Sequence, residues 1–157
     1  MPLFPPSAAS VPLWIAASLA AAMAFKHFLA DFVLQPAWMA RGKERAAGWA
    51  GPLLAHAGCH ALFTLGIVLA AAPRLWWLCA GDLVAHAAVD RAKTLVARRG
   101  GWTPAQDPFW WLLGLDQLLH HLTGLALVLA LLLLPPLGSS IRPNNGPSNC
   151  PAVKMAS

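Results

Sequence analysis

The sequence predicts an all-α integral membrane protein in which residues 11–134 form a bundle of about four transmembrane helices. The first observation is composition: 58% of the residues are hydrophobic and only 11% are charged, which is about half the charged share of a soluble domain. The second is continuity, because residues 52–73 and 117–134 contain no Asp, Glu, Lys or Arg. A helix needs about 20 apolar residues to cross a bilayer, so both segments are long enough.

Four segments are expected to cross the membrane, and each is bounded by residues that end helices. The spans are placed near 11–35, 52–72, 75–97 and 109–134. Pro36, Pro52, Pro73, Gly100, Gly101 and Pro135 stand at their ends. Strands are not expected, because lipid cannot satisfy the backbone groups at the edge of an open sheet and these segments do not alternate. The third span is the most charged, since it contains Asp82, Asp90, Arg91 and Lys93.

The two ends of the chain are expected to lie outside the bundle. Residues 1–10 form a short N-terminal segment. Residues 135–157 are rich in Pro, Ser and Asn and show no periodicity. Such composition is typical of disorder, so we expect a disordered C-terminal tail.

The tryptophans mark the expected membrane interfaces. Trp is enriched at both membrane–water boundaries of membrane proteins. All eight tryptophans lie near the end of an expected span: Trp14, Trp76 and Trp77 on one side, and Trp38, Trp49, Trp102, Trp110 and Trp111 on the other.

The basic residues predict the orientation. Loop 36–51 carries Arg41, Lys43 and Arg45, and the connection before the last span carries Arg98 and Arg99. Cytoplasmic loops are enriched in Lys and Arg, so these two loops are expected in the cytoplasm and both termini outside. The formal net charge of +5 thus reflects topology, and membrane lipids rather than nucleic acid are the expected partners. A homo-oligomer is left open.

Every expected span carries polar side chains at helical spacing. The stripes are His27, Asp31 and Gln35; His56 and His60; His86, Asp90 and Lys93; and Asp116, Gln117 and His120. Residues four apart lie on one face of a helix. Lys26 is expected to face away from the first stripe, and His121 lies about 100° from His120.

The four stripes are expected to meet in one half of the membrane. Because successive spans run antiparallel, each stripe falls on the side of the basic loops. A charged residue at the centre of a span costs about 2.5–3.5 kcal/mol on insertion scales. The stripes are therefore expected to face one another inside the bundle. Asp90 and Lys93 can neutralise each other, and the histidines and aspartates can form hydrogen-bonded pairs without chemistry.

A metal is the leading explanation of the set. Imidazole and carboxylate bind zinc, iron and manganese, and helical bundles hold dinuclear sites with such ligands. One or two divalent ions are expected. The candidate ligands are His27, Asp31, His56, His60, His86, Asp90, Asp116 and His120. Asp31, Asp116 and Lys93 are the candidate catalytic residues, and Gln35, Gln117 and Lys93 can support the ligands or bind a substrate.

Five motifs in order resemble a known family. HFLADFVLQ, Lys43, HAGCH, HAAVDRAK and DQLLH are similar to the bacterial membrane proteins grouped as domain of unknown function 3307, over residues 23–134. The resemblance implies a small multi-pass protein of the bacterial inner membrane and supplies no activity. The layout also looks like that of membrane-embedded metal-dependent hydrolases.

Three functions remain open from the sequence. A metal-bound water with a lowered pKa is the nucleophile of many hydrolases, so the first is a metal-dependent hydrolase acting on a lipid or lipid-linked phosphate. The second is an ion or proton transporter, because buried Asp and His chains also carry protons. The third is a non-catalytic membrane scaffold in which the polar residues only fix helix packing.

Overall fold

The computed structural model describes residues 12–134, and this part of the chain is all-α, as predicted. The five α-helices are α1 (Leu13–Phe28), α2 (Ala37–Lys43), α3 (Ala50–Ala71), α4 (Leu78–Gly100) and α5 (Asp107–Leu133). A π-helical segment, η1 (Leu29–Val33), extends α1, and a 3-10 turn, η2 (Pro73–Leu75), lies between α3 and α4. The segments expected at 1–10 and 135–157 lie outside the described residues.

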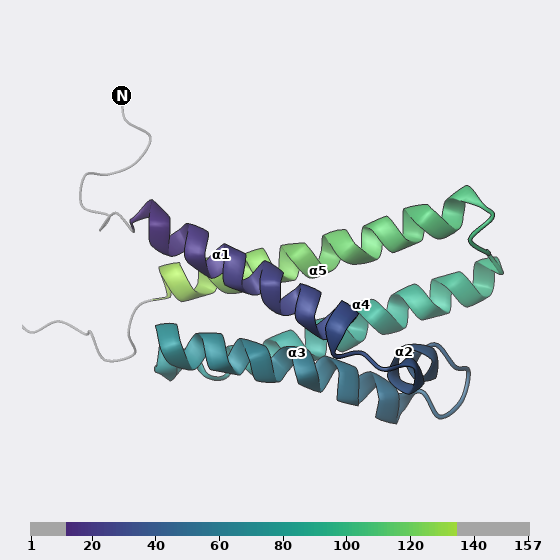
Figure 1. Ribbon diagram of the computed structural model, residues 1–157, viewed down its shortest axis with the longest axis horizontal. Helices are drawn as coiled ribbons and strands as arrows, with labels where there is room; N and C mark the ends of the chain where they lie inside the picture. The colour runs from purple at the N-terminus through teal and green to yellow at the C-terminus, as the bar shows by residue number, and fades with distance from the viewer. Residues whose placement is uncertain (1–11, 135–157) are drawn as a thin grey trace, which may run out of the picture.

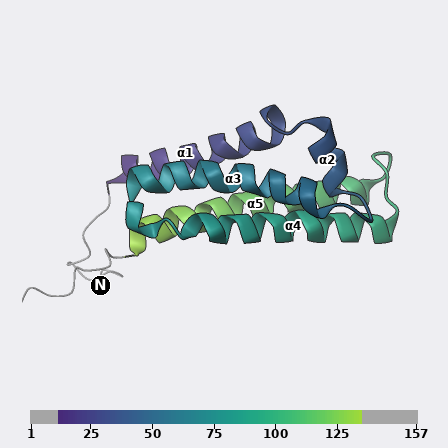
Figure 2. The same ribbon diagram turned by 90° about the horizontal axis from the view of Figure 1, so that it is seen from below.

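Four long helices run lengthwise beside one another (Figures 1 and 2). Both α4 and α1 pack against α3, and α5 packs against α4 and α1. The start of α1, the α3–α4 turn and the end of α5 lie at one end of the bundle. The short helix α2 and the α4–α5 connection lie at the other. The two predicted basic segments therefore share one end, which is called the basic end below.

Within residues 12–134, three helices are long and apolar enough to cross a membrane. They are Leu13–Val33, which joins α1 and η1, Ala50–Ala71 and Asp107–Leu133. The helix α4 has 23 residues, but its charged residues keep it from being identified as a span by composition. Asp82, His86 and Asp90 are buried inside the bundle. Their inward direction makes a crossing by α4 compatible with lipid, and that crossing stays a prediction.

Proline and glycine set the observed helix ends. Pro73 lies two residues after the end of α3, and the 3-10 turn that it begins moves the start of the next helix from the expected 75 to Leu78. Gly101 has φ 62°, the left-handed conformation that commonly ends helices, so α4 extends three residues beyond the expected 97. The segment 36–51, expected as a loop, contains α2, whose Met39 and Gly42 are buried.

The buried interior has two zones. At the end that holds the α3–α4 turn, an apolar core forms from Met23, Val68, Ala72, Leu75, Leu78, Leu127, Val128 and Leu131. Toward the basic end the buried side chains become polar, and His56, His60 and Thr64 are completely inaccessible to solvent. Since an apolar core closes one end, the polar centre is approached from the basic end or from between the helices.

The π-helical segment carries the aspartate of the first stripe. The backbone N–H of Leu34 donates to the carbonyl of Leu29 over 2.9 Å, which is the i to i+5 pattern of a π-turn. Such turns occur mostly as single bulges within α-helices and frequently at functional sites. Here the bulge lies one helical turn before Pro36, and Asp31 is at its centre.

Candidate metal centre

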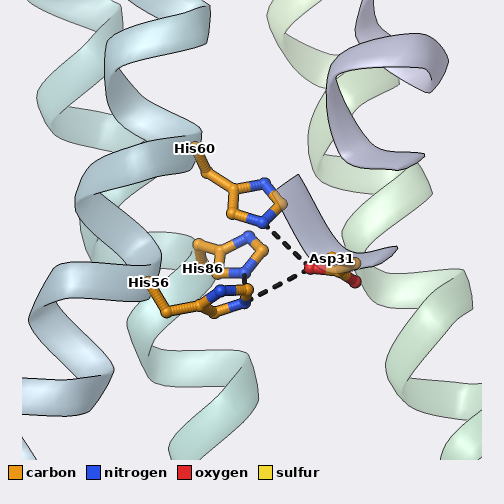
Figure 3. Close-up of side chains that lie close together, drawn as sticks. All are labelled: Asp31, His56, His60 and His86. Carbon is orange, nitrogen blue, oxygen red and sulfur yellow. Dashed lines mark hydrogen bonds and ion pairs between the residues drawn. The ribbon is translucent and has the colours of Figure 1, made fainter. Parts of the chain in front are cut away.

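The four polar stripes meet in the interior. Asp31 from η1, His56 and His60 from α3, and His86 from α4 each offer a ligand atom, and these atoms all lie within 4.8 Å of one another. We call these four residues the first ligand group; Figure 3 shows their side chains converging on one point. Asp31 reaches it from the side opposite the three rings.

The distances within the first group are close to those between ligands of one ion. Asp31 Oδ1 lies 3.0 Å from His60 Nε2 and 3.3 Å from His56 Nε2. His56 Nε2 lies 3.1 Å from His86 Nε2. Zinc–nitrogen bonds of 2.0–2.1 Å in tetrahedral geometry separate neighbouring ligand atoms by about 3.3 Å. Three of the distances are therefore close to those around a tetrahedral ion, and the remaining ligand atoms lie within 4.8 Å of one another.

Hydrogen bonds alone do not explain the contacts of His56. Its Nε2 faces His86 Nε2, Asp31 Oδ1 and, at 3.4 Å, Asp90 Oδ2. A neutral imidazole carries one proton on one of its two nitrogens, so at most one of these contacts is a linear hydrogen bond donated by His56. If His86 donates to His56 instead, the Nε2 of His56 presents a lone pair to both carboxylates. A cation at the centre removes this conflict.

A second ligand group shares His86 with the first. It consists of His86, Asp90 and His120, whose ligand atoms also lie within 4.8 Å of one another. The rings of His86 and His120 have centroids 4.1 Å apart. His120 Nδ1 donates to the backbone carbonyl of Asp116 over 2.8 Å, which leaves the lone pair on Nε2. Metal-binding histidines are commonly held in this way through their other nitrogen.

Three buried polar atoms in the described part of the chain have no hydrogen-bond partner: His60 Nδ1, Asp116 Oδ1 and His120 Nε2. Buried polar atoms are nearly always paired, so each exception calls for an explanation such as an ion or a water. His120 Nε2 belongs to the second ligand group, and a bound cation explains why it has no partner.

His27 and Asp116 contact the groups without belonging to either. His27 Nε2 lies 3.2 Å from Asp31 Oδ2 and 3.2 Å from Gln117 Oε1. Asp116 accepts from Gln117, and its Oδ2 lies 3.8 Å from Lys93 Nζ. Six of the eight predicted ligands thus fall in the two groups, while these two lie at their edge.

Two polar residues at the basic end support the ligands. The Gln35 amide lies 2.9 Å from His56 Nδ1, so it can fix the ring's orientation. Lys43 from α2 donates to Asp90 Oδ2 over 2.8 Å. The expected Asp90–Lys93 pair is therefore not formed, because Lys93 points instead toward Asp116 and Glu44, each at 3.8 Å. The contact of Lys43 was missed because α2 was not predicted.

The expectation for Lys26 was wrong. Lys26 is buried and pairs with Asp82 on α4 over 2.5 Å. It also donates to Thr64 over 2.7 Å, and Thr64 donates to Asp82 over 2.6 Å. We call Lys26, Thr64 and Asp82 the buried triad. One feature of the sequence pointed to this pair, because a buried Asp82 needs a partner inside the bundle. The direction of the Lys26 side chain could not be predicted, because it depends on how α1 packs.

These observations define a class: a helical protein with three candidate membrane spans and a buried His/Asp cluster that can bind a metal. The chain belongs to the DUF3307 family, described as a protein of unknown function, whose model matches residues 19–143. The resemblance seen in the motifs is thereby confirmed over a somewhat longer stretch. No curated protein and no solved structure matches the chain significantly.

Proposed function

We propose that the chain is a metal-dependent hydrolase of the bacterial inner membrane that acts on a lipid or lipid-linked phosphate. The observation that carries the proposal is the convergence of Asp31, His56, His60 and His86 on one buried point. Three imidazoles and one carboxylate suit zinc, iron or manganese. His86 belongs to both groups, so a second ion would be held mainly by Asp90 and His120.

Charge also favours a cation at this point. Asp90 is paired with Lys43 over 2.8 Å. Asp31, in contrast, is surrounded by histidines. The side chain of Asp31 is only 14% exposed, and a carboxylate so far removed from water is costly unless it is paired or binds a metal. A divalent ion supplies the missing positive charge without further lysine or arginine.

The chemistry that a divalent ion supplies is a water whose pKa is lowered toward neutrality, together with polarisation of a phosphoryl oxygen. Hydrolysis would form a bond from a water oxygen to phosphorus and break the bond to the lipid alcohol, which would take up the proton that the water loses. Asp116 is suited to accept the water's proton, because its Oδ1 is buried without a partner among the described residues. Lys93, next to Asp116, is suited to bind the phosphate.

Orientation and assembly belong to the same proposal. With the basic end in the cytoplasm, the site lies in the cytoplasmic half of the membrane and takes lipid from that leaflet. Membrane lipids are then the partners. A homo-oligomer is compatible with the bundle, whose outer faces are apolar.

Phosphate release tests the proposal. The purified full chain is incubated in mixed micelles with phosphatidic acid or a polyprenyl phosphate, and inorganic phosphate is measured. We expect release that a chelator stops, that zinc or manganese restores, and that Asp116→Asn lowers at least about 100-fold. Release that the chelator leaves unchanged would contradict the metal-dependent mechanism.

The buried triad favours one second candidate, an ion or proton transporter. Lys26 and Asp82 extend the polar interior past His27 and His86, and these four side chains line one cavity of about 100 Å³. Proton flux in proteoliposomes that Asp82→Asn abolishes would favour transport. Unchanged flux in Asp82→Asn would count against it.

A further inference from the structure

A cavity opens between α4 and α5 at the basic end. Two lobes of about 320 and 380 Å³ share Trp102 and Leu112, and a third of about 100 Å³ shares Leu112 with both. Figure 1 shows that this is the end at which α4 and α5 are joined by their connection. Leu112 therefore lies at the junction of all three lobes.

The lobes differ in chemistry. The first is lined by Lys93 and Arg98 from α4, with Glu44 at the side. In residues 12–134 no carboxylate forms an ion pair with Arg98, and the nearest carboxylates to Lys93 are at 3.8 Å. The second is lined only by apolar and aromatic side chains, among them Val96, Trp111 and Leu115. A cationic pocket and an apolar one thus adjoin at Trp102 and Leu112.

The third lobe reaches Asp116, at the edge of the candidate metal centre. It is lined by both Lys93 and Asp116, and Asp116 is the residue whose backbone carbonyl holds His120. A group bound by Lys93 is therefore one side chain away from the second ligand group.

The tryptophans place the cavity at the level of lipid head groups. Trp102 lines the first two lobes and Trp111 lines the second, and Trp side chains prefer the membrane–water interface. Cations at that level attract anionic lipids. The apolar lining of the second lobe suits the start of an acyl chain.

We infer that the α4–α5 cavity binds an anionic phospholipid, with its phosphate between Lys93 and Arg98 and the start of an acyl chain along Leu112 and Trp111. This lipid site adds a substrate-binding region to the proposed function. The inference depends on that function in one respect only, namely that the bound lipid is the substrate. Lipid binding itself needs no metal.

Native mass spectrometry of the full chain tests the site. Phosphatidylglycerol or phosphatidylcholine is added to the detergent-solubilised protein in EDTA, and the bound fraction is titrated. We expect phosphatidylglycerol to bind more tightly. The double variant Lys93→Met with Arg98→Gln should weaken its binding about 10- to 30-fold, since each cation contributes about 1 kcal/mol. Arg99→Gln is the matched control, because Arg99 lies on the same helical turn and does not line the cavity; it should change binding less than twofold.

A second variant tests the apolar lobe. Leu112→Trp fills the junction while keeping both cations, and should weaken phosphatidylglycerol binding at least about fivefold, with helix content checked by circular dichroism. Inorganic phosphate at millimolar concentration should compete poorly. Binding that is unchanged in the double variant, or equal for the two lipids, would overturn the site. Effective competition by free phosphate, with no effect of Leu112→Trp, would overturn the lipid assignment.

One further pair of measurements separates this inference from the proposed function. The variant with His56→Ala and His60→Ala should lose metal and keep lipid binding. If the wild-type protein binds no metal but shows the lipid selectivity above, the proposed hydrolase fails and the lipid site stands. If metal binds but the cavity variants bind lipid as the wild type does, the lipid site fails alone.

Discussion

At the scale of single residues, Asp31 is the point on which the polar centre converges. Its carboxylate contacts His27, His56 and His60 within 3.3 Å. The sequence predicted these neighbours because spacing of four residues puts side chains on one helical face. It could not predict which ligands form a group, since that depends on the relative height and rotation of four helices.

The Gln35 contact with His56 leads to a prediction for metal affinity. With its amide rotated by a half-turn, Gln35 Oε1 accepts the Nδ1 proton of His56 and leaves Nε2 free for an ion. Loss of such a partner typically lowers metal affinity 10- to 100-fold. We therefore expect Gln35→Ala to weaken zinc binding about 10-fold or more in a chelator competition titration. Gln106→Ala, on the exposed α4–α5 connection, is the control, and equal affinity in both variants would contradict this role.

At the scale of elements, buried ion pairs join helices that are distant in the sequence. Lys26–Asp82 joins α1 to α4, and Lys43–Asp90 joins α2 to α4. Sequence analysis missed the first because α1 packs against both α3 and α5, so its inward arc is wider than one stripe and includes Lys26 as well as His27. It missed the second because α2 has only seven residues, too few to show a clear period.

The Lys26–Asp82 pair predicts a loss of stability that a second change repairs. Lys26→Met leaves Asp82 as an uncompensated buried charge, which typically costs about 3–5 kcal/mol. We expect this loss in the free energy of unfolding measured by denaturant titration in detergent.

The matching double variant, Lys26→Met with Asp82→Leu, should recover most of the stability, because apolar pairs replace buried ion pairs at little cost. Arg99→Gln serves as a surface control with a change below about 0.5 kcal/mol. A double variant as unstable as the single one would show that the pair is not the cause.

At the scale of the whole molecule, the polar centre and the basic elements share one end of the bundle. The common depth of the stripes was predictable, because antiparallel spans return to the same side. The α4 helix is the element on which topology depends, since its charges turn inward and composition alone does not identify it as a span. If only the three apolar helices crossed the membrane and α4 did not, both ends of α4 would lie on the same side.

Labelling from the two sides of the membrane tests the crossing of α4. Arg74→Cys lies before α4 and Gln106→Cys lies after it; each is made in a chain whose native cysteines are changed to serine. We expect a membrane-impermeant maleimide to label Arg74→Cys in intact spheroplasts and Gln106→Cys only after lysis. Labelling of both positions from the same side would exclude α4 as a span.

The central claim is that this buried His/Asp cluster holds a metal, and elemental analysis of the purified full chain tests it most directly. We predict one or two equivalents of zinc, iron or manganese per chain, and loss of at least one equivalent when His56 and His60 are both changed to alanine. His121→Ala, which removes an exposed histidine, should keep the metal. A folded wild-type protein that contains no metal after reconstitution, or a double variant that keeps its full complement, would contradict the account.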